Sequence, residues 1–475
     1  MQFYLVLFIL CLNLVGADKP NIVFVFTDDQ ASWSVSANPD AHPNARTPNM
    51  DKLIHSGANL INSFTITPVC SPSRAALMTS KYGTELGITD WIHPRNEPEK
   101  GLDPAILTFP KLLKKAGYFN GIIGKWHLGL PDKFKPSEFD FDYFMGNRKG
   151  GFATVNPELE IDGKIVKSQG LTADLLGDDA VKFIHNNKAK TFFLAVHFRA
   201  PHTSWLPVAD EDKAPYKDLK PEDIKLPNPD YPNLNKKKLY KMTVDYLSSV
   251  RSVDRNLGKI MKALDDTGLT GKTLLIFSSD HGYSMGHNGI WHKGNGHWVL
   301  TKNPAVKNKN IPNGQRPNLY DNSLRVPTFV RWPGVIKEGT VIDSTVSNLD
   351  WFPTFCEVAG IENPKENIIR GKSIVSLLKD PKTEWDNEFY TEYSTKHQSK
   401  THMRGIRTKK WKLVLDFRNP ERHELYNLEK DAAETKNEYL NPEMKSIVEQ
   451  LTKKIKAKMA ELNDPVLNDP QFDFK

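Results

Sequence analysis

The chain has 475 residues, of which 39% are hydrophobic and 25% are charged. This composition supports a large buried core and excludes a chain that is disordered throughout. The formal net charge of +7 is modest for this length. Because the sequence has no arginine-rich arm and no zinc-finger spacing, we expect no nucleic acid among its partners.

The first 17 residues have the pattern of a signal peptide. An apolar run from Phe3 to Leu12 leads to the small residues of Val15-Gly16-Ala17, and Asp18 ends the segment. It departs from the usual pattern because no Lys or Arg precedes the apolar run. The run is short for a bilayer span, and we expect no integral membrane segment elsewhere. We therefore expect residues 1–17 to be removed on export, to the periplasm, the exterior or a lysosome.

Apolar strand patterns alternate with helical patterns over residues 18–376. The predicted strands are Ile22–Phe26, Gly121–Ile123, Phe192–Phe198, Leu274–Phe277 and Thr328–Arg331. The predicted helices are Leu107–Ala116, the segment from Leu239 to Leu264 with apolar residues every three or four positions, and Asp350–Ala359. This alternation predicts an α/β domain with a large, mainly parallel sheet flanked by helices.

The pattern changes after about Ser376. Short antiparallel strands are expected at Met403–Thr408, Trp411–Phe417 and Glu424–Tyr426. A Lys-rich amphipathic helix follows from Glu443 to about Leu462, and its lysines are typical of a solvated face. Residues 377–475 are therefore expected to form a smaller α+β subdomain with a short antiparallel sheet.

Polar side chains follow four of the predicted strands. After Phe26, Ile123, Phe198 and Phe277 come, respectively, Asp28 with Asp29, Lys125 with His127, His202, and Asp280 with His281. Because ligands of open α/β sheets bind beyond the carboxyl ends of the strands, we expect these side chains to form one site.

Asp28 and Asp29 are adjacent carboxylates, which repel each other unless a cation or protons separate them. Hard oxygen ligands of this kind suit Ca²⁺ or Mg²⁺, and Asp280 could complete the set. His281 could ligate the ion, contact a substrate or only fill the turn.

The segment Pro68–Met78 combines a cysteine with the start of a helix. Pro72 suits a first helical turn, and the residues from Arg74 onward can continue it. Cys70 would then lie at the N-terminus of the helix, where free N–H groups favour an anion. Arg74 adds a bidentate donor for a tetrahedral oxyanion.

Two cysteines remain once the signal peptide, which contains Cys11, is removed. Cys70 and Cys356 are far apart in sequence and make no disulfide framework. Cys356 lies in the apolar helix Asp350–Ala359, where a buried hydrophobic role is expected. An exposed free thiol at Cys70 would be a liability in an oxidising compartment, so this cysteine needs its own explanation.

Cys70-Ser71-Pro72-Ser73-Arg74 matches the Cys-x-Pro-x-Arg signature of type I sulfatases, a family of the alkaline phosphatase superfamily. The resemblance extends across most of the chain, through Pro20-Asn21-Ile22-Val23 with Asp28-Asp29, Gly124-Lys125-Trp126-His127, Ser279-Asp280-His281-Gly282, Leu324-Arg325-Val326-Pro327 and Glu424-Leu425-Tyr426-Asn427-Leu428. The order and spread of these motifs identify the chain as a member of that family.

The resemblance implies that Cys70 is oxidised by a formylglycine-generating enzyme to formylglycine. The hydrate of that residue is a geminal diol, with one hydroxyl to attack sulfur and a second to expel the sulfate. The resemblance also implies a Ca²⁺ ion that binds the sulfate and the diol, held by Asp28, Asp29, Asp280 and His281.

The resemblance implies roles for the remaining polar residues as well. Arg74 and His127 should orient and polarise the diol, with His127 a candidate base for sulfate expulsion. Lys125 should bind a sulfate oxygen. His202 should do likewise or protonate the leaving alkoxide, and Asp280 is a candidate to take the proton of the attacking hydroxyl.

One family position has two candidates in this sequence. A substrate-binding lysine usually lies shortly before the Arg-Val-Pro stretch. Lys293 matches it by local motif but is separated from that stretch by a polar insertion of residues 294–317, whereas Arg316 matches it by spacing, four residues before Tyr320. Lys293 is slightly favoured, and either residue would supply a cation to sulfate.

The sequence therefore predicts a sulfuric ester hydrolase that acts on a sulfated carbohydrate, a polysaccharide or its oligosaccharides. Five loop residues are candidates either for sugar contacts or for ordinary loop packing: Trp33, Trp91, His93, Arg95 and Trp205. The alternatives are a phosphatase or phosphonate monoester hydrolase of the same superfamily, and a non-catalytic protein that binds sulfated glycans.

Overall fold

The structure is a computed structural model that describes residues 19–474, except 162, 306–307, 363 and 365–366. The expected signal peptide lies outside the described residues. Within them, no helix has the length and apolarity needed to cross a membrane.

The centre of the fold is a ten-stranded sheet with the order β15-β2-β14-β9-β1-β8-β4-β5-β6-β7. Its four middle strands are parallel: β9 (Thr273–Ser279), β1 (Asn21–Thr27), β8 (Phe192–His197) and β4 (Phe119–Lys125). All residues of β9, β1 and β8 are buried, as expected for parallel strands covered on both faces. The prediction of these four strands is confirmed.

The outer strands make the sheet mixed. The predicted strand at Thr328–Arg331 is present as β14 (Phe329–Arg331), and it pairs antiparallel with β9. The remaining strands are β2 (Ala58–Leu60), β15 (Thr340–Ile342), β5 (Tyr143–Asn147), β6 (Glu158–Ile161) and β7 (Lys164–Lys167). A two-stranded sheet of β3 (Ser63–Phe64) and β16 (Val346–Ser347) lies apart from them.

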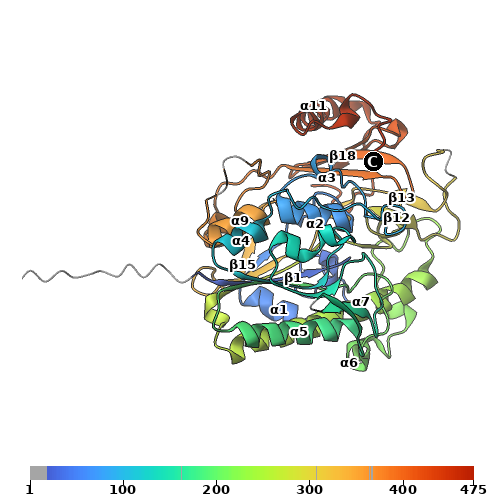
Figure 1. The fold of residues 1–475 in the computed structure, drawn as a ribbon. Coiled ribbons are helices and arrows are strands. Elements are labelled where there is room, and N and C mark those ends of the chain that lie inside the picture. The colour runs from blue at the N-terminus through green and yellow to red at the C-terminus, as the bar shows by residue number, and fades with distance from the viewer. Residues whose placement is uncertain (1–18, 162, 306–307, 363, 365–366, 475) are drawn as a thin grey trace, which may run out of the picture.

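Helices cover both faces of the large sheet (Figure 1). One layer holds α1 (Pro48–His55), α5 (Thr172–Asn187) and α7 (Lys236–Asp266), and the other holds α2 (Cys70–Thr79), α4 (Phe109–Lys115) and α9 (Trp351–Val358). Alternate residues of β1 face the two layers, with Val23 and Val25 in one core cluster and Ile22, Phe24 and Phe26 in the other. The predicted apolar stripe of α7 is buried, and so is Cys356 on α9.

The polar insertion begins and ends in a small antiparallel sheet. This sheet has the order β10 (Ser284–Met285), β11 (Ile290–His292), β12 (Asn295–Trp298) and β13 (Gln315–Pro317). The short helices α3 (Gly83–Leu86), α6 (Asp210–Lys213), α8 (Asp321–Leu324) and α10 (Val375–Lys379) complete the catalytic region.

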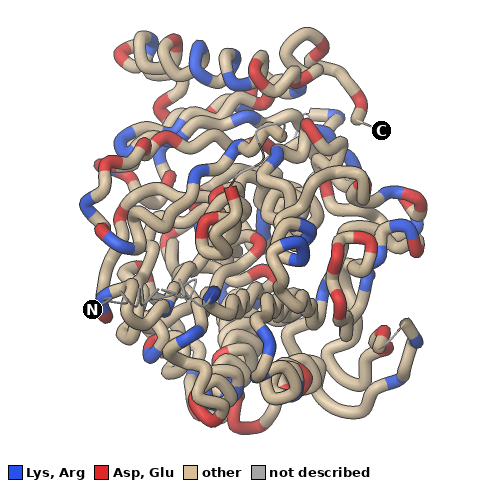
Figure 2. The backbone as a smooth tube through the Cα atoms, turned by 60° about the vertical axis from the view of Figure 1, so that its left-hand side comes forward, with Lys and Arg blue, Asp and Glu red and all other residues tan. Residues whose placement is uncertain are grey.

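The C-terminal part of the chain forms the expected antiparallel sheet with a helix outside it. The sheet contains β17 (Phe389–Thr395), β18 (Thr401–Arg407), β19 (Trp411–Asp416) and β20 (Glu424–Asn427). Helix α11 (Lys445–Glu461) buries Leu451, Ile455 and Met459 in one cluster with this sheet and lies at the top in Figure 1. Acidic and basic residues are interspersed along the backbone, including along α11 (Figure 2).

Candidate active site

The carboxyl ends of the four parallel strands bring the predicted polar residues together. Phe26 of β1 is level with His197 of β8, and Thr27 is level with Ser279 of β9, so these strands end side by side. The potential ligand atoms of Asp28, Cys70, Asp280 and His281 all lie within 4.8 Å of one another, as do those of Asp28, Asp29, Cys70 and His202. The cluster therefore combines residues that follow β1, β8 and β9 with the start of α2, and Lys125 at the end of β4 contacts it through Asp28.

Cys70 is the first residue of α2, as the proline in its motif predicts. Its side chain is 3% exposed. Its Sγ lies 3.5 Å from Asp28 Oδ1, 3.6 Å from His281 Nε2 and 3.2 Å from Lys293 Nζ. Burial and then Asp28 raise the pKa of the Cys70 thiol to about 12. The unmodified thiol is therefore protonated at neutral pH, unlike the thiolates of cysteine nucleophiles.

Three buried carboxylates are paired with three buried cations. Lys125 donates to Asp28, Lys293 Nζ lies 2.5 Å from Asp29 Oδ1, and Arg74 Nη2 lies 2.9 Å from Asp280 Oδ2. Burial opposes the charge of Asp28, but Lys125 and other cations hold the pKa of this carboxyl well below its ordinary value. All three carboxyl side chains are fully buried, so without these partners their charges would be very costly.

The donor set around His281 fits a hard divalent cation. His281 Nδ1 lies 3.0 Å from the carbonyl oxygen of Gly282, which can only accept, so in the neutral ring Nε2 presents a lone pair. His281 Nε2 lies 3.2 Å from Asp29 Oδ1 and 3.2 Å from Asp280 Oδ1. Among the described residues, no hydrogen-bond donor reaches the buried Asp29 Oδ2. A cation between these atoms would satisfy them all.

His127 follows β4 and presents one free ring nitrogen. Its Nε2 donates to the carbonyl oxygen of Ile92 at 3.2 Å, and the N–H of Ile92 donates to Ser71 Oγ, beside Cys70. Nδ1 is therefore an acceptor, and it is buried with no partner in the described part of the chain. Gly150 packs on the ring so closely that a Cβ there would lie 2.3 Å from it.

His202 lies in the same cluster on its partly exposed side. Its Nδ1 lies 2.6 Å from the carbonyl oxygen of Thr203, so this nitrogen carries the ring proton and Nε2 can accept. Among Asp28, Asp29, Cys70 and His202, only His202 is partly exposed.

The structure separates the two candidates for the substrate-binding cation. Lys293 lies in the turn between β11 and β12, in contact with Asp29 and Cys70. Arg316, on β13, instead donates to Glu424 and to the hydroxyl of Tyr320. Arg316 is therefore held at the C-terminal sheet and not in the cluster.

Two residues that position the site were not predicted. His197 ends β8, and its Nδ1 lies 3.2 Å from Arg74 Nη1 and 3.1 Å from the carbonyl oxygen of Lys125. Tyr246 on α7 donates from its hydroxyl to the carbonyl oxygen of Asp29 at 2.8 Å. A lone histidine at the end of an apolar strand was a usable signal for His197, whereas Tyr246 is part of an apolar stripe.

The aromatic loop residues divide into two groups. Trp33 and Trp205 are 4% and 8% exposed and pack against Tyr246, as ordinary loop packing predicts. Trp91 and His93 are partly exposed, with ring centroids 4.7 Å apart, and both contact His397 of the C-terminal subdomain. Arg95 is exposed.

Comparisons with known proteins agree with the site. The family model "Sulfatase" matches residues 20–361, and the model "N-sulphoglucosamine sulphohydrolase, C-terminal" matches residues 315–461. The chain is 25% identical to an N-acetylglucosamine-6-O-sulfatase of Bacteroides thetaiotaomicron, over 95% of this chain and 88% of that protein. It is 27% identical to an ulvan-active sulfatase of Formosa agariphila, over 94% and 82%.

Solved structures show the same fold. A structure of a complex with D-glucosamine-2-N,6-O-disulfate, described as that protein's substrate, has a TM-score of 0.76 at 24% identity and covers 95% of this chain and 99% of that chain. A structure of another protein with k-i-k-neocarrahexaose has a TM-score of 0.73 at 26% identity and covers 96% and 95%.

Proposed function

This chain belongs to the type I sulfatase family of the alkaline phosphatase superfamily, and from that premise we propose that it removes sulfate from a sulfated carbohydrate with oxidised Cys70 as its nucleophile. The observation that supports this most directly is the position of Cys70 at the start of α2, enclosed by carboxylates and lysines. The N-terminus of a helix favours the negative charge of a bound sulfate.

The proposal includes two groups that the polypeptide must acquire. A maturation enzyme would convert Cys70 to formylglycine, whose hydrate supplies a nucleophilic hydroxyl and a second hydroxyl that releases sulfate. A Ca²⁺ ion would supply charge neutralisation to the sulfate, held by the oxygen and nitrogen ligands Asp28, Asp29, Asp280 and His281.

The side chains of the cluster divide the remaining work. Lys125 and Lys293 would bind sulfate oxygens, because each presents a buried ammonium group beside the carboxylates next to Cys70. Arg74, fixed by Asp280 and His197, would orient the modified residue. The free Nδ1 of His127 is an acceptor for the proton released when sulfate leaves.

His202 lies at the partly exposed side of the cluster, and we place it beside the leaving alkoxide. A sugar alkoxide is a poor leaving group and needs a proton more than a phenolate does. Burial lowers the pKa of His202 to about 4, and Nε2 of the neutral ring is an acceptor, so His202 would donate to the alkoxide only after its ring takes up a proton.

A carbohydrate substrate is supported by the relatives and by the surface beside the site. The curated relatives include an N-acetylglucosamine-6-O-sulfatase and an ulvan-active sulfatase, and a 26% identical structure holds k-i-k-neocarrahexaose. Trp91 and His93 offer partly exposed ring faces next to Ile92, which contacts both Ser71 and His127. Sugars stack on such faces. We also propose that the protein is exported after removal of residues 1–17, to a compartment in which such polymers occur.

The decisive experiment measures sulfate release by the matured enzyme from sulfated glycans and from an aryl sulfate, and phosphate release from the matching aryl phosphate. We expect sulfate release to exceed phosphate release and Cys70→Ala to abolish it. Lys293→Ala should lower kcat about 10²-fold to 10³-fold, the usual effect of losing one donor to a transition-state oxyanion.

The matched control is Lys302→Ala, which removes an exposed lysine of the polar insertion and should leave kcat unchanged. Dominant phosphate release would instead favour the phosphatase of the same superfamily. Full activity of Cys70→Ala, or a tryptic peptide that keeps an unmodified Cys70 in active enzyme, would refute the mechanism.

A further inference from the structure

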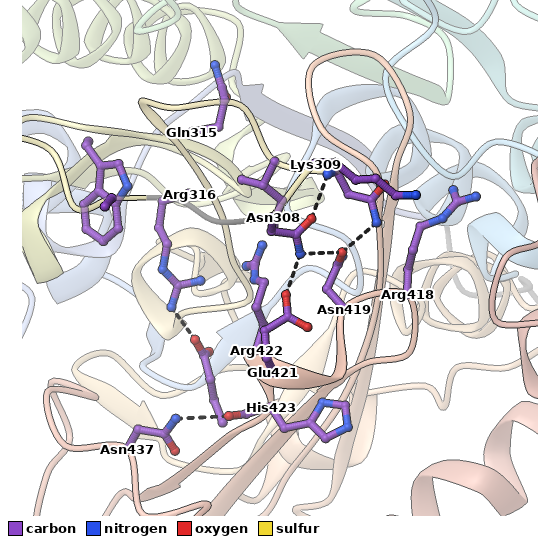
Figure 3. A pocket seen from close by; sticks show the side chains of 15 residues that line it. Asn308, Lys309, Gln315, Arg316, Arg418, Asn419, Glu421, Arg422, His423 and Asn437 are labelled. Carbon is purple, nitrogen blue, oxygen red and sulfur yellow. Dashed lines mark hydrogen bonds and ion pairs between the residues drawn. The ribbon is translucent and has the colours of Figure 1, made fainter.

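A cavity of about 700 Å³ lies between the polar insertion and the C-terminal sheet (Figure 3). One wall comes from residues 308–316 of the insertion, and the other comes from residues 418–424, between β19 and the start of β20. Asn437 and Trp298 complete the lining. None of these residues belongs to the cluster around Cys70.

Basic side chains of this cavity outnumber acidic ones. Arg316, Arg418, Arg422 and Lys309 face only two acidic side chains of the lining, Glu421 and Glu424. Arg316 is paired with Glu424, and Arg418 with Asp473 outside the lining.

Among the residues that the structure describes, Arg422 has only a long ion pair with a carboxylate, that of the buried Asp416. Its Nη2 donates to the carbonyl oxygen of Pro317 at 2.5 Å, and its Nε is 3.8 Å from Asp416 Oδ2, beyond hydrogen-bond distance. Burial and the neighbouring Arg316 lower the pKa of Arg422, because both disfavour its charge, and Asp416 and Glu424 oppose this shift only in part. A bound anion nearby would stabilise the positive charge of the Arg422 guanidinium.

The neutral side chains of the cavity suit sugar hydroxyl groups. Asn308 and Asn310 both donate to Asn419 Oδ1, at 2.8 Å and 2.9 Å, which fixes the three amides in one network. Amides and guanidinium groups recognise hydroxyl and sulfate oxygens, and the indole of Trp298 offers a ring face. The combination is typical of a site for an anionic sugar.

The small sheet joins this cavity to the catalytic cluster. Lys293 lies at the start of the turn into β12, and along that strand Gly296 pairs with Arg316. Asn318 fixes the turn by donating to the carbonyl oxygen of Lys293 at 3.0 Å. At ~3.3 Å per residue of extended chain, Lys293 and the level of Arg316 are at most roughly 10 Å apart along the backbone, a distance that a few sugar units span.

We propose that this cavity binds a sulfate or carboxylate group on a remote sugar of the same glycan chain whose sulfate ester is hydrolysed at Cys70. This inference rests on the proposed function. It assigns the enzyme an extended, multiply charged substrate and assigns the 294–317 insertion a binding role.

The test compares a sulfated hexasaccharide, taken from the polysaccharide that the wild type desulfates best, with a small aryl sulfate. The variants are Lys309→Ala, Arg422→Gln and the double variant. Gln can still donate to Pro317, and the Lys309 side chain is exposed, so folding should be retained. We expect the double variant to raise KM for the hexasaccharide about tenfold, with kcat and all aryl sulfate kinetics within twofold of the wild type.

Lys409→Ala is the control, because it removes an exposed lysine from the turn between β18 and β19. An unchanged KM for the hexasaccharide in the double variant would overturn the proposal. Equal losses on both substrates would also overturn it, because they would reflect damage to the catalytic cluster.

Failure of the proposed function has a different signature, in which the wild type releases sulfate from neither substrate. The cavity would then be tested by calorimetric titration with a hexasaccharide from each of the sulfated polysaccharides that were assayed. Affinity that is equal in the wild type and the double variant would reject the site, and a tenfold loss in the double variant would support it.

Discussion

Asp29 has a φ of 69°, a left-handed conformation that is uncommon outside glycine. Two contacts hold it there: its N–H donates to Asp280 Oδ1 at 3.2 Å, and the Tyr246 hydroxyl donates to its carbonyl oxygen. The bend directly after β1 allows the carboxylates of both Asp28 and Asp29 to lie in one cluster. Backbone strain of this kind costs on the order of 1 kcal/mol and commonly accompanies ligand sites.

Calcium should stabilise the folded chain through these carboxylates. At a Ca²⁺ concentration of 100 times Kd, binding to the native state adds about 2.7 kcal/mol, so Tm should rise by several degrees and EDTA should reverse the rise. Asp29→Asn should abolish most of the shift, because it removes a charged ligand. Thermal scans measure this without catalysis.

The control for that experiment is Asp343→Asn, at an exposed position outside the cluster. It should keep the full Ca²⁺ shift. A Tm of the wild type that does not respond to Ca²⁺, or an equal response in Asp29→Asn, would argue against the proposed ligand set.

Most of the cluster could be predicted from the sequence, because continuous apolar runs define where parallel strands end. Asp28, Lys125 and Asp280 follow such runs directly. His197 and Tyr246 could not be found by that rule, since both lie within the apolar patterns themselves. The positions of Lys293 and Arg316 also needed the structure, because only the folded chain shows that Lys293 contacts Asp29 and Cys70 whereas Arg316 contacts Glu424.

At the scale of elements, α7 does more than cover the sheet. Its buried stripe includes Asp254, whose Oδ1 accepts from the backbone N–H groups of Asn49 and Met50 at 2.9 Å and 2.8 Å. These groups belong to the first turn of α1 (Pro48–His55), which has no side-chain cap of its own. A carboxylate from another helix therefore caps α1.

This cap should make stability depend on pH. Burial raises the pKa of Asp254 to about 6, although its hydrogen bonds and Arg251 oppose the shift. A carboxyl group whose pKa is raised in the folded state stabilises the folded state most at a pH below its unfolded pKa. For Asp254 this stabilisation is lost as the pH rises through about 6. Relative to Asp254→Asn, the wild type should therefore gain about 1 kcal/mol in free energy of unfolding from pH 7 to pH 5.

Denaturant titrations of both proteins at several pH values measure this difference. Asn keeps the oxygen that accepts from Asn49 and Met50, so the variant should fold. A difference between the two proteins that stays constant from pH 7 to pH 5 would contradict the raised pKa.

Some elements could not be predicted from the sequence, for physical reasons. Strand β17 is buried throughout, yet it contains Glu392, and a charged residue argues against a buried strand. The structure explains its burial, because the Glu392 carboxylate accepts hydrogen bonds from the N–H and the hydroxyl of Thr84. Strand β7 (Lys164–Lys167) is exposed at every residue and has no apolar face. Helix α5 did carry a usable signal in Leu176, Ala180, Phe183 and Ile184.

At the scale of the whole molecule, the two predicted domains share one core cluster. Val69 and Ala76, around the start of α2, pack in the same cluster as Tyr393 and Leu413 of the C-terminal sheet. Tyr393 also approaches Gly294, next to Lys293. The enclosure of Cys70 therefore depends on both parts of the chain.

An alkylating reagent should consequently label Cys70 of the unmodified folded chain only at the rate of unfolding. Both Cys70 and Cys356 are at most 3% exposed, so Cys356 serves as the internal reference. Peptide mass spectrometry after timed exposure to iodoacetamide measures the two rates, which denaturant should raise together. Rapid labelling of Cys70 alone in native buffer would show that the site opens locally.

The burial of Cys70 has a consequence for the proposed maturation. A second protein that oxidised this thiol would need access to it, yet in the folded chain every residue of α2 is buried. On the proposed function, oxidation would therefore precede folding of the segment Pro68–Met78. The yield of active enzyme would then depend on the rate of oxidation relative to the rate of folding.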